Sequence, residues 1–109
     1  MNFNEYQIKS FENAVYPNKK INWKYPLIGL CGEVGELANK CKKIIRDDHG
    51  IITEKKREEV SSEMGDLLWY LASLATEFDL KLETIANSNL AKLQSRKERN
   101  KMKGSGDHR

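Results

Sequence analysis

Two short acidic segments of the chain, GEVGEL and SEMGDL, have residues suited to binding a divalent cation. The first places Glu33 and Glu36 three residues apart, and the second places Glu63 and Asp66 three residues apart. On a helix, residues three apart share one face, about 60° from each other. Four carboxylates gathered together raise one another's pKa unless a cation neutralises them. If the two helices pack antiparallel, the pairs converge near their midpoints and form a cation site.

The ligand set favours a hard cation. Carboxylate oxygens suit magnesium, with manganese as the alternative, rather than zinc. A di-iron bundle would supply Glu-x-x-His pairs, but His49 and His108 lie outside both segments. Most single acidic pairs on helices are solvated, yet two matched pairs favour a site. Gly35 and Gly65 each cost about 1 kcal/mol relative to alanine in a helix, which predicts that another group approaches closely at both.

Basic side chains elsewhere in the chain could hold phosphate. Asn89, Lys92 and Arg96 have the i, i+3, i+7 spacing of one helix face and are candidates for binding phosphate oxygens. Lys43 is a further candidate, whereas Lys40 could simply pair with Glu36. Six basic residues and one acidic residue between positions 92 and 103 could contact nucleic acid, or could form a solvated helix end. Acids for a metal and cations for phosphates together fit metal-assisted attack of water on a phosphoryl centre.

The apolar periodicity predicts an all-α fold, an antiparallel bundle of about four helices. Expected helices run from about residue 4 to 15, 26 to 46, 55 to 78 and 82 to 99. Asn4 is the expected cap of the first, with Gln7 in a capping box and Ile8, Phe11 and Val15 as its packing face. The third helix should bury a face that includes Met64 and Phe78.

Length and composition indicate one domain, residues 1–103, followed by a glycine-rich tail, residues 104–109. With 109 residues and 39% hydrophobic side chains, a single chain has little core, so oligomerisation should complete the bundle. Cys31 and Cys41 are about 15 Å apart along a helix, which predicts buried, reduced thiols rather than a disulfide. No membrane span or secretory signal is present, so a cytoplasmic location is expected.

Aromatic residues near the acidic segments are candidates for stacking a nucleobase. Tyr70 shares the helix edge that carries Glu63, and Trp23 lies just before the first acidic helix. Tyr25 is a further candidate, although core packing explains Trp23 equally well. Trp69 points away from the acidic edge, which predicts a subunit contact.

In this order, the segments YPLIGLCGEVGELANKCKK, SEMGDL, NSNLAKLQSR and KGSGDHR resemble the MazG-like, all-α nucleoside triphosphate pyrophosphatases. The similarity extends from about residue 25 to the C-terminus and includes the E-x-x-E and E-x-x-D pairs. It implies that Glu33, Glu36, Glu63 and Asp66 bind magnesium, with Glu36 as the preferred general base. It also implies that Asn89, Lys92 and Arg96 contact the triphosphate.

The resemblance further implies hydrolysis of ribo- or deoxyribonucleoside triphosphates to the monophosphate and pyrophosphate, in nucleotide-pool housekeeping by a homodimer or a dimer of dimers. Base and sugar preference stay open. One alternative is a non-catalytic helical module that only oligomerises. Another is a nucleic-acid-binding protein that uses residues 92–103, which is disfavoured because the acidic helices would repel a phosphate backbone.

Overall fold

Residues 1–99, which the computed structural model describes, form four helices and no strand. The helices are α1 (Phe3–Glu12), α2 (Lys24–Asp47), α3 (Glu54–Glu77) and α4 (Leu82–Glu98). The predicted all-α class is therefore confirmed, and each predicted helix exists with ends shifted by at most a few residues. The predicted boundary after residue 103 and the glycine-rich tail lie outside the described residues.

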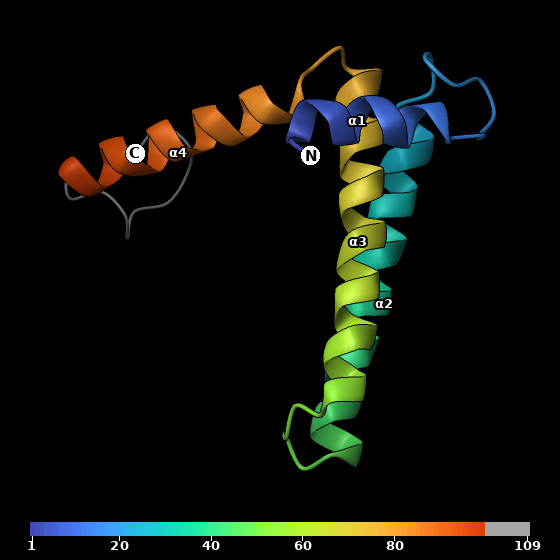
Figure 1. The fold of residues 1–109 in the computed structure, drawn as a ribbon, viewed down its shortest axis with the longest axis vertical. Coiled ribbons are helices and arrows are strands. Elements are labelled where there is room, and N and C mark those ends of the chain that lie inside the picture. Colours follow the sequence, from blue (N-terminus) through green and yellow to red (C-terminus); the bar gives the residue numbers. More distant parts are fainter. Residues whose placement is uncertain (100–109) are drawn as a thin grey trace.

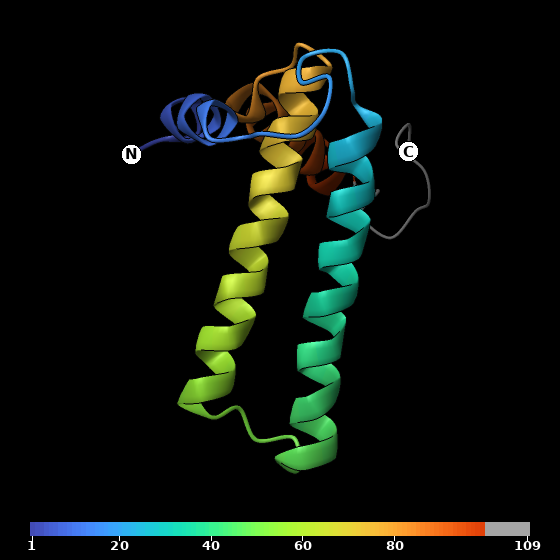
Figure 2. The same ribbon diagram turned by 90° about the vertical axis from the view of Figure 1, so that its right-hand side faces the viewer.

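The longest elements, α2 and α3, form an antiparallel hairpin and pack side by side along its length (Figures 1 and 2). Residues 48–53 connect them, and His49 and Gly50 both have positive φ angles, 55° and 79°, which reverse the chain. The N–H groups of Asp48 and Gly50 close the end of α2 on the carbonyl of Ile44 at 3.1 and 3.0 Å. Thr53 caps α3 by accepting a hydrogen bond from the N–H of Lys56 at 3.2 Å.

The core of a single chain is small. Of the side chains predicted to bury the face of α3, Met64 is 56% exposed and Phe78 is 52% exposed, so that prediction is wrong for both. Instead, α3 buries Ala72 and Ser73, and α1 packs against α3. The buried hydrophobic residues of the described chain are Ala14, Tyr16, Ile44, Ala72, Ala75 and Leu82.

The predicted start and packing face of α1 are wrong. Asn2, not Asn4, caps the helix by accepting a hydrogen bond from the N–H of Glu5 at 2.9 Å. Ile8 is 62% exposed, and Val15 lies beyond the helix and is 94% exposed. The buried residues of α1 are the polar Gln7 and Ser10, because the helix contacts its neighbours through hydrogen bonds that apolar periodicity does not reveal.

The loop between α1 and α2 is held in place by the carboxylate of Glu77, near the end of α3. That carboxylate accepts hydrogen bonds from the hydroxyl of Tyr16 and from the N–H groups of Lys20 and Asn22, the last two at 2.8 Å each. Burial alone would raise the pKa of Glu77, but these three hydrogen bonds outweigh burial and lower it. One charged group thus fixes a loop of irregular backbone, in which Asn18 and Lys20 have positive φ angles.

The last helix, α4, does not join the hairpin. It begins after a sharp turn at Asp79, where φ is 56°, and projects away from α2 and α3 at a steep angle (Figure 1). Among the described residues, α4 packs against α1 and makes no comparable contact with α2 or α3. None of the described helices is both long and apolar enough to cross a bilayer.

Candidate metal centre

Three of the four predicted acidic residues meet between α2 and α3. One carboxylate oxygen from each of Glu33, Glu63 and Asp66 lies within 4.8 Å of the other two. Glu33 and Glu63 are half-buried in the hairpin, whereas Asp66 is exposed at its edge. The antiparallel packing that the sequence predicted is what brings them together. We call these three side chains the acidic cluster.

Glu36, the fourth predicted ligand, is exposed and lies outside the acidic cluster. Its negative charge nevertheless acts on Glu33 in the cluster. The pKa of Glu33 is raised by burial, then by a hydrogen bond with Glu63, and then by the negative charges of Asp66, Glu63 and Glu36. Glu36 therefore lies close enough to add to the negative charge of the site.

The acidic cluster fits a divalent cation. Three carboxylates this close repel one another, and a divalent cation between them would relieve that repulsion. The ligand atoms are oxygens alone, which suits magnesium or manganese. Exposed acidic groups can also gather without a metal, but the raised pKa of Glu33 indicates a cost in free energy that cation binding would remove.

Two tyrosines adjoin the acidic cluster. The pKa of the Tyr70 phenol is raised by burial and then by the charges of Tyr25, Glu33 and Asp66, which agrees with its predicted place on the acidic edge. Burial and then the charge of Asp66 likewise raise the pKa of Tyr6 on α1. Tyr6 was not predicted near the site, because no sequence pattern shows where α1 crosses α3.

A glycine does allow close helix packing at this site, but it is Gly29. A methyl group added at Gly29 would overlap the ring of Tyr70 from α3. Methyl groups added at Gly35 or Gly65 would meet no atom of the described chain, outside their own helical turns, within 4 Å. The prediction of a close approach at those two positions is therefore wrong for the single chain.

The candidate phosphate-binding residues are not beside the acidic cluster in one chain. Asn89, Lys92 and Arg96 lie on α4, which projects away from the hairpin (Figure 1). Asn89 is exposed, Lys92 is half-buried and Arg96 is buried. The three residues thus differ in exposure, and their approach to the acids needs another element or another subunit.

The lysines after the first acidic pair behave as surface groups of the hairpin. Lys40 and Lys43 are both half-buried on α2. The pKa of Glu59 is lowered mainly by a hydrogen bond from Lys56 and more weakly by the charge of Lys40. The alternative pairing of Lys40 with Glu36 does not occur among the ion pairs of residues 1–99.

The other aromatic candidates have partners within the chain. Tyr25 stacks on Tyr16 with ring centres 4.9 Å apart and planes 7° apart. The indole N–H of Trp69 donates to the carbonyl of Ser10 at 3.2 Å, so Trp69 anchors α1 rather than serving only as the predicted subunit contact. Trp23 lies 5.8 Å from the ring of Phe78 and is 43% exposed.

Both cysteines are free thiols, as predicted, but both are exposed, so their predicted burial is wrong. Both lie on α2, whose buried residues are Pro26 and Ile44. The apolar pattern of α2 was interpreted as one stripe, whereas the structure divides it between a face against α3 and a face open to solvent.

Comparison with known proteins agrees with this helical site. The MazG nucleotide pyrophosphohydrolase domain family matches residues 25–100, which include both acidic pairs and all of α4. The Gene 37 protein of Mycobacterium phage L5 is 45% identical over 114 aligned residues, covering 100% of both proteins. No solved structure matches at a significant level. The chain therefore belongs to the MazG nucleotide pyrophosphohydrolase family.

Proposed function

We propose that this protein hydrolyses nucleoside triphosphates, ribo- or deoxyribonucleotides, between the α- and β-phosphates and releases the monophosphate and pyrophosphate. The observation that carries the proposal is the acidic cluster on two helices that both lie within the family match. Such a reaction would serve housekeeping of the nucleotide pool, and the proposed location is the cytoplasm.

In this proposal, Glu33, Glu63 and Asp66 hold a magnesium ion, with manganese as a substitute. When bound, the ion would neutralise the phosphate oxygens and increase the acidity of water at the site. Glu36 completes the set of four acids. It is proposed as the general base because it is exposed and stands apart from the other three, and as a further ligand because its charge acts on Glu33. A carboxylate can accept the proton of the attacking water only if it is ionised and within hydrogen-bonding reach.

The cationic face of α4 is proposed to bind the triphosphate. The guanidinium of Arg96 suits bidentate contact with phosphate, and Lys92 offers a point charge one turn earlier. Asn89 adds a neutral donor on the same face, and Lys43 is a further candidate on α2. Trp23 and Tyr70 are proposed to stack the base, since Tyr70 adjoins the acidic cluster and Trp23 is partly exposed just before α2.

The proposal is tested with a panel of ribo- and deoxyribonucleoside triphosphates incubated with magnesium. The expected products are the monophosphate and pyrophosphate in equal amounts. Orthophosphate as the sole product would overturn the assigned bond. The panel also ranks the bases and sugars, and repeating it with EDTA and with manganese tests the metal.

We also propose that the protein acts as a homodimer or a dimer of dimers. One face of α2 carries a stripe at alternating spacings of four and three residues, which is the pattern of helix pairing. Its members are all exposed in the single chain, where Val34 is 49% and Ile45 is 75% accessible. The stripe consists of Leu27, Cys31, Val34, Ala38, Cys41 and Ile45.

A second copy of the chain is the proposed partner for this stripe, because one chain alone buries too little apolar surface for a stable core. By helical angle, Met64 and Leu71 of α3 lie on the same side of the hairpin as the stripe. By the same angles, Glu36 and Asp66 lie on the opposite side. Two hairpins could therefore pair through their apolar sides and leave both acidic sites open.

Mass measurement by light scattering tests this assembly. The wild-type protein should elute as a dimer or tetramer, and Val34→Lys should dissociate it by placing a charge within the stripe. Ile28→Lys is the matched control, because Ile28 is 71% exposed but lies off the stripe. A monomeric wild-type protein would contradict the proposal.

A further inference from the structure

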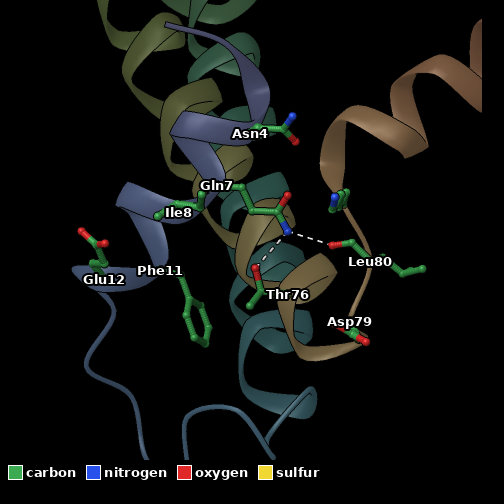
Figure 3. A pocket seen from close by; sticks show the side chains of 9 residues that line it. Asn4, Gln7, Ile8, Phe11, Glu12, Thr76, Asp79 and Leu80 are labelled. Atoms are coloured by element: carbon green, nitrogen blue, oxygen red, sulfur yellow. Dashed lines mark hydrogen bonds between the residues drawn. The ribbon is translucent and has the colours of Figure 1, made fainter.

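The side-chain amide of Gln7 connects α1 to the junction between α3 and α4. Its Nε2 donates to Thr76 Oγ1 at 3.0 Å and to the carbonyl of Leu80 at 2.8 Å (Figure 3). Its Oε1 accepts the N–H of Leu82 at 2.8 Å. The side chain is only 8% exposed. One buried amide thus binds the end of α3, the turn and the first residue of α4.

Gln7 takes the place of the missing cap of α4. The residue at the cap position, Lys81, makes no side-chain capping hydrogen bond. The first N–H groups of a helix have no partner within it, and a side-chain oxygen usually accepts one of them. Here that oxygen comes from another helix, about 75 residues earlier in the chain. The start of α4 is therefore tied to α1.

A second bond strengthens the same connection. Asn4, one turn earlier on α1, donates to Glu83 Oε2 at 2.6 Å. Because α4 packs against α1 and makes no comparable contact with α2 or α3 among the described residues, α1 sets its direction. The direction of α4 in turn decides where Asn89 and Lys92 lie.

We propose that Gln7 is a positioning residue that fixes the angle between the metal-binding hairpin and the phosphate-binding face of α4. The inference rests on the proposed role of that face. Gln7 itself touches neither the acidic cluster nor the face; it acts through the turn at residues 79–81. The pattern in the sequence suggested a local capping box for Gln7, whereas the structure assigns its amide to another helix.

A distance measurement tests the placement without any substrate. Spin labels are attached to an Arg46→Cys substitution on α2, outside the stripe, and to a Lys97→Cys substitution on α4, in a Cys31→Ala, Cys41→Ala background. The labelled chains are diluted with unlabelled protein so that only distances within one chain contribute. Gln7→Met, which keeps the shape but removes all three hydrogen bonds, should widen the distance distribution about two-fold or more.

Two control variants separate placement from stability. Gln94→Met replaces the exposed glutamine of α4, which within residues 1–99 bonds only Glu98 on its own helix, at 3.1 Å, and should leave the distribution narrow. Tyr16→Phe removes a bond that connects the α1–α2 loop to Glu77 of α3, and not to α4, so it should lower stability without widening the distribution. An unchanged width in Gln7→Met, or equal widening in Tyr16→Phe, would overturn the inference.

Kinetics connect the placement to function. In Gln7→Met, the KM for a triphosphate should rise about ten-fold, equivalent to about 1.4 kcal/mol, while kcat changes little. The rise in Tm on adding magnesium should match that of the wild type, since the acidic cluster lies on the hairpin. If KM stays at the wild-type value while the distribution widens, the positioning role is refuted. If the wild type hydrolyses no triphosphate, the proposed function fails, and the distance measurement still decides whether Gln7 fixes α4.

Discussion

Glu33 on α2 and Glu63 on α3 approach each other across the helical hairpin, with one carboxylate oxygen of each within 4.8 Å of the other. Two carboxylates this close repel each other unless a proton or a cation reduces their charge. Asp66 adds a third carboxylate oxygen within 4.8 Å of both. A divalent cation bound at this site would favour the ionised carboxylates, so metal binding should be linked to proton release.

Glu63→Gln should abolish both hydrolysis and magnesium binding. The amide removes one negative ligand, and we expect the activity to fall about 100-fold or more. The rise in Tm that magnesium causes in the wild type should disappear, because stabilisation by a ligand requires binding. Circular dichroism should show unchanged helix content. Glu58→Gln, an exposed acid on the same helix, is the matched control, and wild-type activity in Glu63→Gln would defeat the metal assignment.

Lys92→Ala should weaken substrate binding more than it alters the fold. Loss of one charge-assisted contact with phosphate raises the KM about ten-fold, whereas thermal unfolding should change little. Lys97→Ala removes an exposed charge from the same helix and serves as the comparison. Identical KM and kcat in Lys92→Ala and the wild type would remove Lys92 from the site.

Gly29→Ala should destabilise the protein, because the added methyl group would overlap the ring of Tyr70. Overpacking of this kind typically costs about 1–3 kcal/mol. Gly32→Ala, one turn later on α2, meets no other atom of the described chain within 4 Å and should stabilise the helix by up to about 1 kcal/mol. Urea unfolding of both variants measures the difference. Equal effects would show that α2 and α3 are not in close contact at Tyr70.

The pH dependence of the free energy of unfolding should reveal the contribution of the Glu77 carboxylate. Its pKa is lowered in the folded chain, so its contribution is present above the ordinary carboxyl range, about pH 4.3, and is lost as the pH falls through the folded value. At pH 7, Glu77→Gln should therefore lose about 1–3 kcal/mol of unfolding free energy. The difference from the wild type should shrink below about pH 4. Glu33, whose pKa is raised, has the opposite pH dependence, so comparing matched variants isolates Glu77. A difference that stays constant down to pH 3 would contradict the role of Glu77.

The hairpin and its acidic cluster were predictable because the evidence is local and repeated. Matching acid–glycine–acid segments and long apolar stripes define α2 and α3, and antiparallel packing of two such helices brings Glu33 close to Glu63. The three-dimensional convergence of three acids followed directly. The place of Glu36 beside the group rather than within it depends on side-chain directions, which spacing alone leaves open.

The surroundings of the hairpin were less predictable. Gln7 and Glu77 stabilise the fold through hydrogen bonds to backbone groups more than 50 residues away, and sequence periodicity contains no information about such bonds. The exposure of Cys31 and Cys41 was missed for a related reason. An apolar helix stripe shows that a surface is covered, but it does not show whether the same chain covers it.

The contacts of α1 also determine when the fold can be completed. Gln7 bonds Thr76, Leu80 and Leu82, which lie 69, 73 and 75 residues later in the chain. The hairpin needs only one short connection and therefore closes early, whereas contacts of such long range form late. During synthesis, α1 leaves the ribosome before α3 and α4, so the residues that Gln7 bonds are made only later. Mutations that weaken these contacts should therefore speed unfolding more than they slow folding.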